Sequence, residues 1–137
     1  MCLPIDDVNN YNNTVNMTSN EYQISAMRTC MESCHNEAYA LSGITAEVGE
    51  LNDKVAKWIR SGICRWDHNR LVFNTSDEAV ANKYREELAY ELGDVRWFVA
   101  LLSLLLGYTD EKIAQMNIDK LRDRAQRGVI DGNGDNR

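Results

Sequence analysis

Two pairs of acidic side chains are spaced so that they could bind a cation. Glu47 and Glu50 lie three residues apart, and so do Glu91 and Asp94. Residues three apart share one face of a helix, with about 5–6 Å between their Cβ atoms. If the two helices pack side by side, four like charges converge, and burying them without a counter-charge is costly. Oxygen ligands favour Mg²⁺, Mn²⁺ or Ca²⁺ over zinc or copper, so the sequence predicts a site for a hard cation.

The other interpretation of the four carboxylates is a solvated helix surface, where most acidic side chains lie. The glycines inside the pairs argue against it, because Gly49 and Gly93 occupy matching positions. Glycine in a helix interior costs up to about 1 kcal/mol relative to alanine. Its presence twice therefore indicates the close approach of another backbone or of a ligand.

Two helices are expected in the first half of the chain. Thr18 followed by Glu21 has the form of a capping box and predicts a helix from about residue 18 to about residue 33. Apolar residues recur at three- and four-residue spacing over residues 37–60 and predict a second helix. Gly62 provides a plausible stop for it.

Two more helices are expected in the second half. Asp77 is placed to cap a third helix that runs to about residue 106 and ends at Gly107. Thr109 or Asp110 then caps a fourth helix, which ends near residues 127–128. Four main helices with few glycines and prolines inside them predict an all-α, four-helix bundle-like fold.

The remaining segments define the domain organisation. Residues 61–77 form a longer connection than usual, which hints at function or at a short ordered hairpin around residues 71–73. Residues 1–17 are asparagine-rich and aperiodic and are expected to form a loose arm. Residues 129–137 are expected to form a tail, which leaves one helical domain over residues 18–128.

Composition restricts the partners of this domain. The net charge of −6 argues against a nucleic-acid-coating or anionic-membrane surface, although a bound cation would still allow a phosphate ligand. The chain starts without a signal-peptide pattern, and the apolar run over residues 95–106 is too short to span a membrane and contains Arg96. We therefore expect a cytoplasmic protein. Because the same run is apolar on nearly every face, we also expect a homo-oligomer, either a dimer or a tetramer.

The cysteines offer a second conceivable metal site. Cys30, Cys34 and His35, with Cys64 and His68 further on, could be imagined around zinc. Their spacing matches no strong zinc pattern. Reduced cysteines that pack as small hydrophobic side chains are the better interpretation.

Several ordered motifs resemble a known family. The acidic pairs and the strings around them are similar to those of the all-α nucleoside triphosphate pyrophosphohydrolases, specifically the MazG-like group. The matching segments are EYQ (21–23), AEVGEL (46–51), ELGDV (91–95) and NIDKL (117–121) followed by Arg124, and the ending GNGDNR (132–137) resembles short phage-encoded members. The interval between the acidic pairs is longer than in compact members, and the extra length falls in residues 61–77.

The resemblance implies a reaction. Family members hydrolyse nucleoside triphosphates, often deoxy forms, to the monophosphate and pyrophosphate with Mg²⁺, and so control nucleotide pools. Mg²⁺, or Mn²⁺ in its place, would be bound by Glu47, Glu50, Glu91 and Asp94. One carboxylate could instead act as the general base for water, and Glu50 or Glu47 is expected in that role.

The resemblance also implies substrate contacts. Lys54 could form an ordinary pair with Glu50 four residues earlier, or reach the phosphates as part of the catalytic set. The basic residues of the fourth helix are expected at the phosphates, its asparagine at the sugar or a phosphate, and a glutamine and a tryptophan at the base. The expected substrate-binding residues are Gln23, Trp58, Asn117, Lys120 and Arg124.

Two other functions are compatible with these residues. A nucleotide alarmone could be the substrate of the same site. Alternatively, the chain could be a non-catalytic helical interaction protein, with acidic pairs that bind a basic partner and an apolar helix that mediates assembly. The sequence leaves open the base, the sugar, the number of metal ions and the choice between dimer and tetramer.

Overall fold

The computed structural model describes residues 16–130, and over that range it confirms the all-α fold. The predicted arm over residues 1–17 and tail over residues 129–137 lie outside the described residues, except for residues 16–17 and 129–130. The elements in chain order are α1 (Ser19–Met27), a short 3₁₀ turn (Glu32–Cys34), α2 (Glu37–Arg60), β1 (Cys64–Asp67), β2 (Arg70–Phe73), α3 (Glu78–Leu105) and α4 (Asp110–Gln126).

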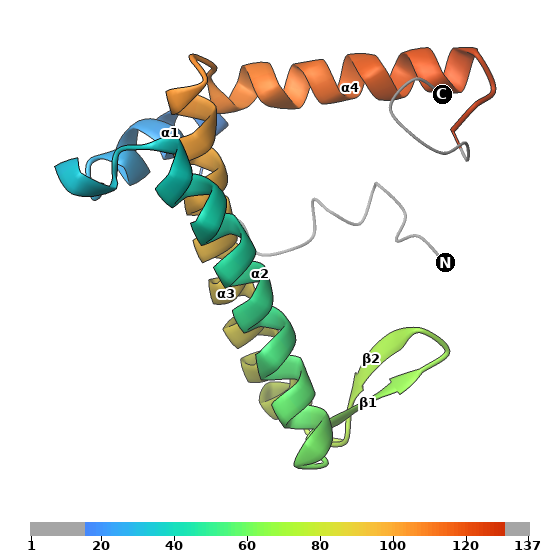
Figure 1. Cartoon of the computed structure of the whole chain (residues 1–137). Helices are drawn as coiled ribbons and strands as arrows, with labels where there is room; N and C mark the ends of the chain where they lie inside the picture. The colour runs from blue at the N-terminus through green and yellow to red at the C-terminus, as the bar shows by residue number, and fades with distance from the viewer. Residues whose placement is uncertain (1–15, 131–137) are drawn as a thin grey trace.

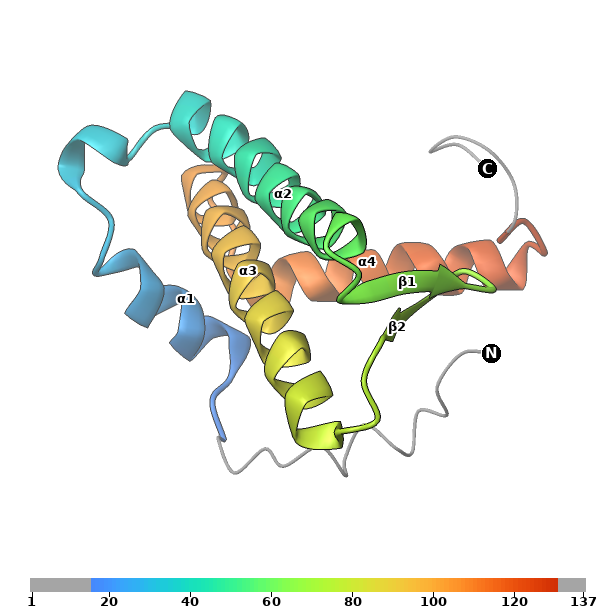
Figure 2. The same ribbon diagram turned by 90° about the horizontal axis from the view of Figure 1, so that it is seen from below.

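The helices α2 and α3 form a long antiparallel pair, and the other elements pack against it (Figure 1). The hairpin of β1 and β2 connects them at one end of the pair. Near the other end α1 packs beside α3, on the side away from α2 (Figure 2). From this end α4 leaves at 92° to α3, so the four helices of one chain do not close into a compact bundle.

The capping residues explain where α2, α3 and α4 begin. The side chain of Asn36 accepts a hydrogen bond from the N–H of Tyr39 at the start of α2. Asp77 and Thr109 cap α3 and α4 in the same way. The predicted bounds of the second helix are confirmed, and the predicted third and fourth helices end within about two residues of the observed ones.

The first helix ends earlier than the sequence predicts. The capping box of Thr18 and Glu21 is present, but α1 stops at Met27, so the predicted end near residue 33 is wrong. The carbonyl of Ala26 accepts hydrogen bonds from the Thr29 hydroxyl at 2.6 Å and from the Trp97 indole N–H at 3.2 Å. The Ala26 carbonyl therefore has hydrogen-bond donors from side chains, and the helix can end there without leaving this carbonyl unpaired.

One glycine sets the separation of α2 and α3. A Cβ added to Gly43 would fall inside the ring of Phe98 on α3. Phe98 itself is buried, and it packs edge-on against Trp97 with ring centroids 4.9 Å apart. The helices can therefore approach closely only because residue 43 has no side chain.

An aromatic cluster fixes the hairpin to the helix pair. The rings of Trp58 on α2 and Tyr84 on α3 lie 5.1 Å apart, and Phe73 of β2 stacks on Tyr84 at 5.4 Å. The turn between the strands places His68 and Asn69 in the left-handed region, at φ 46° and 64°, as a two-residue hairpin turn requires. The hairpin predicted around residues 71–73 is confirmed.

A buried side chain of α1, Gln23, bonds both sides of the corner between α3 and α4. The Gln23 amide donates to the carbonyls of Ala100 and Tyr108, both at 3.2 Å. Its oxygen accepts from the N–H of Asp110, also at 3.2 Å. Gly107 makes the bend possible, since its φ is 81°.

No single helix within residues 16–130 is both long enough and apolar enough for a membrane span. The pair of α3 and α4 meets the length and composition criteria only when the two helices are taken together across their 92° bend.

Candidate functional site

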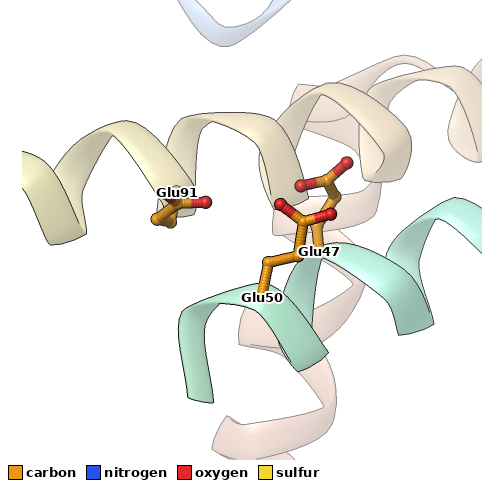
Figure 3. A group of neighbouring side chains, drawn as sticks. All are labelled: Glu47, Glu50 and Glu91. Atoms are coloured by element: carbon orange, nitrogen blue, oxygen red, sulfur yellow. The ribbon is translucent and has the colours of Figure 1, made fainter. Parts of the chain in front are cut away.

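Three of the four predicted metal ligands converge between α2 and α3. Carboxylate oxygens of Glu47, Glu50 and Glu91 all lie within 4.8 Å of one another. Figure 3 shows the two α2 carboxylates and the α3 carboxylate on the facing sides of the two helices. The antiparallel pairing brings the middle of α2 beside the middle of α3, and the three-residue spacing puts both α2 carboxylates on one face.

The chemistry of this donor set fits a hard divalent cation. In an octahedral shell with metal–oxygen bonds of about 2.0–2.1 Å, ligand oxygens are about 3–4 Å apart. The limit of 4.8 Å within which the three carboxylate oxygens lie is compatible with such a shell. Burial, and then the nearby charges of Glu50, Asp94 and Glu91, raise the pKa of Glu47 above its ordinary value. A cation placed among these groups would remove the like-charge repulsion.

Asp94 lies outside the group of three. Its side chain is exposed, and it is close enough for its charge to act on Glu47, but it does not converge on the same point. The two glycines also differ from the sequence-based interpretation. A Cβ added to Gly49 or Gly93 would meet nothing within 4 Å, so no described part of the chain approaches them closely. Among the described residues the close contact between the two helices occurs at Gly43, against the Phe98 side chain, and the approach of a ligand to Gly49 or Gly93 stays a prediction.

A lysine already occupies part of the site. The Lys54 ammonium lies 2.6 Å from a carboxylate oxygen of Glu91, across the helix interface. The hydrogen bond to Glu91 raises the pKa of Lys54, and the charges of Glu87 and Glu50 act in the same direction. The ordinary pairing of Lys54 with Glu50 in its own helix is therefore replaced by a pair between helices.

A hollow of about 590 Å³ opens beside the carboxylates. Trp58 forms an apolar wall and is itself mostly buried, so the predicted base-contacting tryptophan does lie next to the acidic group. Lys57 and Asp53 form an ion pair in the same lining, although the sequence-based site did not include them. Asp53 follows Glu50 by three residues and Lys57 follows Lys54 by three, and this spacing was the signal that could have found them. The hollow is lined by Glu50, Asp53, Lys54, Lys57, Trp58 and Glu91.

The predicted residues of α4 lie elsewhere in the single chain. Asn117 and Lys120 line a second hollow, also of about 590 Å³, in the corner between α3 and α4. Arg96 and Asp110 contribute charges to this corner, and burial raises the pKa of Asp110 while Arg96 lowers it. Arg124 is buried further along α4 and is not part of either lining.

Gln23 is also separate from the acidic group. All three of its hydrogen bonds join backbone groups at the corner of α3 and α4, and its side chain is buried. The geometry therefore gives this residue a structural task. Of the predicted set, one chain brings together Glu47, Glu50, Lys54, Trp58 and Glu91.

Comparison with known proteins decides the family. Residues 35–129 match the MazG nucleotide pyrophosphohydrolase domain. The chain belongs to the MazG family. The matched range contains both acidic pairs, the hairpin and α4, but begins after α1 and Gln23.

A phage protein supports the same assignment. The MazG chain is 34% identical over 123 residues to the Gene 37 protein of Mycobacterium phage L5, and the alignment covers 85% of this chain and 96% of the phage protein. No solved structure matches significantly. As a MazG protein the chain is a hydrolase that acts on nucleoside triphosphates, which favours an enzyme over a non-catalytic interaction protein. MazG enzymes generally need a divalent metal, and the acidic group of α2 and α3 is the candidate for it.

Proposed function

We propose that this enzyme hydrolyses a nucleoside or deoxynucleoside triphosphate to the monophosphate and pyrophosphate with Mg²⁺, or with Mn²⁺ in its place. The convergence of Glu47, Glu50 and Glu91 beside a hollow that also contains Lys54 and Trp58 supports this proposal most directly. These groups provide, in one hollow and its immediate neighbourhood, oxygen ligands for a cation, a positive charge for a phosphate and an apolar wall.

Each side chain has a proposed task. Bound at the carboxylates, the cation would neutralise triphosphate charge and polarise the phosphoanhydride. Glu47 and Glu91 are partly buried between the helices and serve as its ligands. Glu50 is exposed and lines the hollow, so it can reach a water molecule and take its proton. Asp94 lies one turn after Glu91 and completes the ligand set after a side-chain rotation.

The residues of α4 act, in this proposal, on the site of a second copy. Asn117 and Lys120 are separated from the acidic group of their own chain by the 92° corner. In a homo-oligomer α4 can extend over a neighbouring helix pair, where Asn117, Lys120 and Arg124 would contact sugar and phosphates.

Exposed apolar side chains support self-association. The sequence predicts that one chain cannot cover the apolar run over residues 95–106, and Val99, Leu104 and Leu106 are indeed exposed in one chain. Met116 and Leu121 on α4 are exposed as well. Large apolar side chains that are exposed in one chain become buried when such surfaces form an oligomer interface.

Pyrophosphate release from a panel of ribo- and deoxynucleoside triphosphates, with Mg²⁺ or Mn²⁺, tests the proposed reaction. Glu50→Gln should lower kcat about 10²–10⁴-fold with metal affinity retained, as loss of a general base does. Glu47→Gln should instead weaken metal binding measured by calorimetry. Glu86→Gln, an exposed change on the same helix as Glu91, is the matched control and should leave both quantities unchanged. Absence of pyrophosphate from every triphosphate would contradict the proposal.

A further inference from the structure

The ion pair between Lys54 and Glu91 joins a positive charge to one of the three converging carboxylates. The ammonium and the carboxylate oxygen are 2.6 Å apart, and the two side chains are only 29% and 16% exposed. Glu91 is therefore simultaneously a member of the candidate metal group and the partner of a lysine.

The choice of Glu91 over Glu50 follows from burial. Glu50 lies four residues before Lys54, the favourable spacing for an ordinary helix pair, but it is exposed. Glu91 is less accessible to water, so its charge is screened less and gains more from a close counter-ion. The charges of Glu87 and Glu50 also favour the protonated form of Lys54 and raise its pKa.

A lysine and a divalent cation cannot both bind Glu91 closely without repelling each other. The three carboxylates lie within 4.8 Å, so a cation among them would be a near neighbour of the Lys54 ammonium. A divalent ion has twice the charge of the ammonium and contacts oxygen at only about 2.0–2.1 Å. Its stronger electrostatic attraction for the carboxylate would displace the lysine.

We propose that Lys54 is a resident cation that holds Glu91 in the metal-free protein and competes with the divalent ion for it. Metal binding then releases Lys54 into the hollow that it lines with Glu50, Lys57 and Trp58. The lysine becomes available to a phosphate only after the metal has bound, which imposes an order on the binding steps. This inference relies on the proposed function only for the place of the metal.

Calorimetric titration with MnCl₂ in the absence of nucleotide tests the competition. Lys54→Met should bind Mn²⁺ about tenfold more tightly than the wild type, because a charge-assisted pair no longer has to be broken. Lys57→Met is the matched control. It removes the same charge from the same hollow, but Lys57 pairs with Asp53 and not with the metal group. The affinity of Lys57→Met for Mn²⁺ should stay within about twofold of the wild-type value, since a screened surface charge has little effect on metal binding.

Equal affinities of Lys54→Met and Lys57→Met, or no metal binding by any variant, would overturn the inference. Pyrophosphate release is not used, so the inference and the proposed function can fail independently. Circular dichroism checks that Lys54→Met is folded. If it is not, the side-chain ¹⁵N resonance of Lys54 in the wild type provides the answer, because it should shift on saturation with Mg²⁺ while that of Lys57 does not. An unshifted Lys54 resonance would contradict the release.

Discussion

At the scale of single residues, Glu47 is partly buried among like charges. Burial and three neighbouring carboxylates raise its pKa above the ordinary value for glutamate. At a pH between the ordinary pKa of the unfolded chain and the raised pKa of the folded protein, the folded protein binds more protons at this residue than the unfolded chain does. The free energy of unfolding therefore decreases as the pH rises through that interval, and ionised Glu47 destabilises the metal-free fold at neutral pH.

Glu47→Gln is accordingly expected to raise the melting temperature of the metal-free protein at pH 7.5. The gain should amount to a few tenths of a kcal/mol, the usual cost of a like-charge pair, and should shrink as the pH is lowered towards the ordinary pKa of glutamate. Differential scanning fluorimetry at several pH values measures it, with Glu86→Gln as the control. A variant that melts lower than the wild type at pH 7.5 would show that Glu47 is stabilising.

The spacing of residues in the sequence predicted part of this site. It correctly indicated that Glu47 and Glu50 share a helix face, because that follows from the period of an α-helix alone. It did not indicate the partner of Lys54, nor that Asp94 lies outside the group of three. Both depend on the rotation and register of α2 against α3, to which contacts between distant residues contribute, such as that of Gly43 with Phe98.

At the scale of elements, the same contact controls the packing of the helix pair. Gly43→Ala should destabilise the protein by about 1–2 kcal/mol, because overpacking against the Phe98 ring outweighs the better helix propensity of alanine. Gly49→Ala on the same helix meets no neighbour within 4 Å and should stabilise it by about 0.5–1 kcal/mol. Urea denaturation followed by circular dichroism compares the two, and similar changes in both variants would contradict the role of Gly43.

The hairpin should depend on its aromatic anchor. Phe73→Ala removes a ring that stacks on Tyr84 and contacts Trp58, and it should cost about 1–3 kcal/mol in local stability. Amide exchange of residues 64–73 should then accelerate while α2 and α3 remain protected. Trp66→Ala, at a side chain that is 60% exposed on β1, is the control and should have little effect.

Local signals predicted most elements. Caps at Asp77 and Thr109 and a long apolar stripe were sufficient for α2, α3 and α4, since these signals act within a few residues. The end of α1 could not be predicted, because the Trp97 indole that bonds the Ala26 carbonyl comes from a distant part of the chain. The direction of α4 was unpredictable for the same reason, because it relies on bonds from distant residues of α1, those of Gln23 at the corner and those of Asn20 to Glu111.

At the scale of the whole molecule, the projecting α4 and its exposed apolar side chains predict assembly. The chain should sediment at a multiple of its 15.6 kDa mass at micromolar concentration. Leu121→Glu places a charge on an exposed apolar position of α4 and should shift the distribution towards the monomer. Lys112→Glu adds negative charge to an exposed position on the same helix and should not do so. A wild-type protein that sediments only as a monomer would rule out the proposed role of α4 in a second copy.

Gln23 has a further consequence for the order in which the chain folds. Its partners lie 77, 85 and 87 residues later in the sequence. In contrast, α2, the hairpin and α3 follow one another directly along the chain. Contacts across such long intervals carry a larger loop-closure entropy and form later. We therefore expect the hairpin-linked pair to fold first and the corner to close last. In native-state hydrogen exchange the Asp110 amide should open at a lower free energy than amides in the middle of α3. The orientation of α4, and with it any assembly that depends on α4, would then be the last feature of the protein to be established.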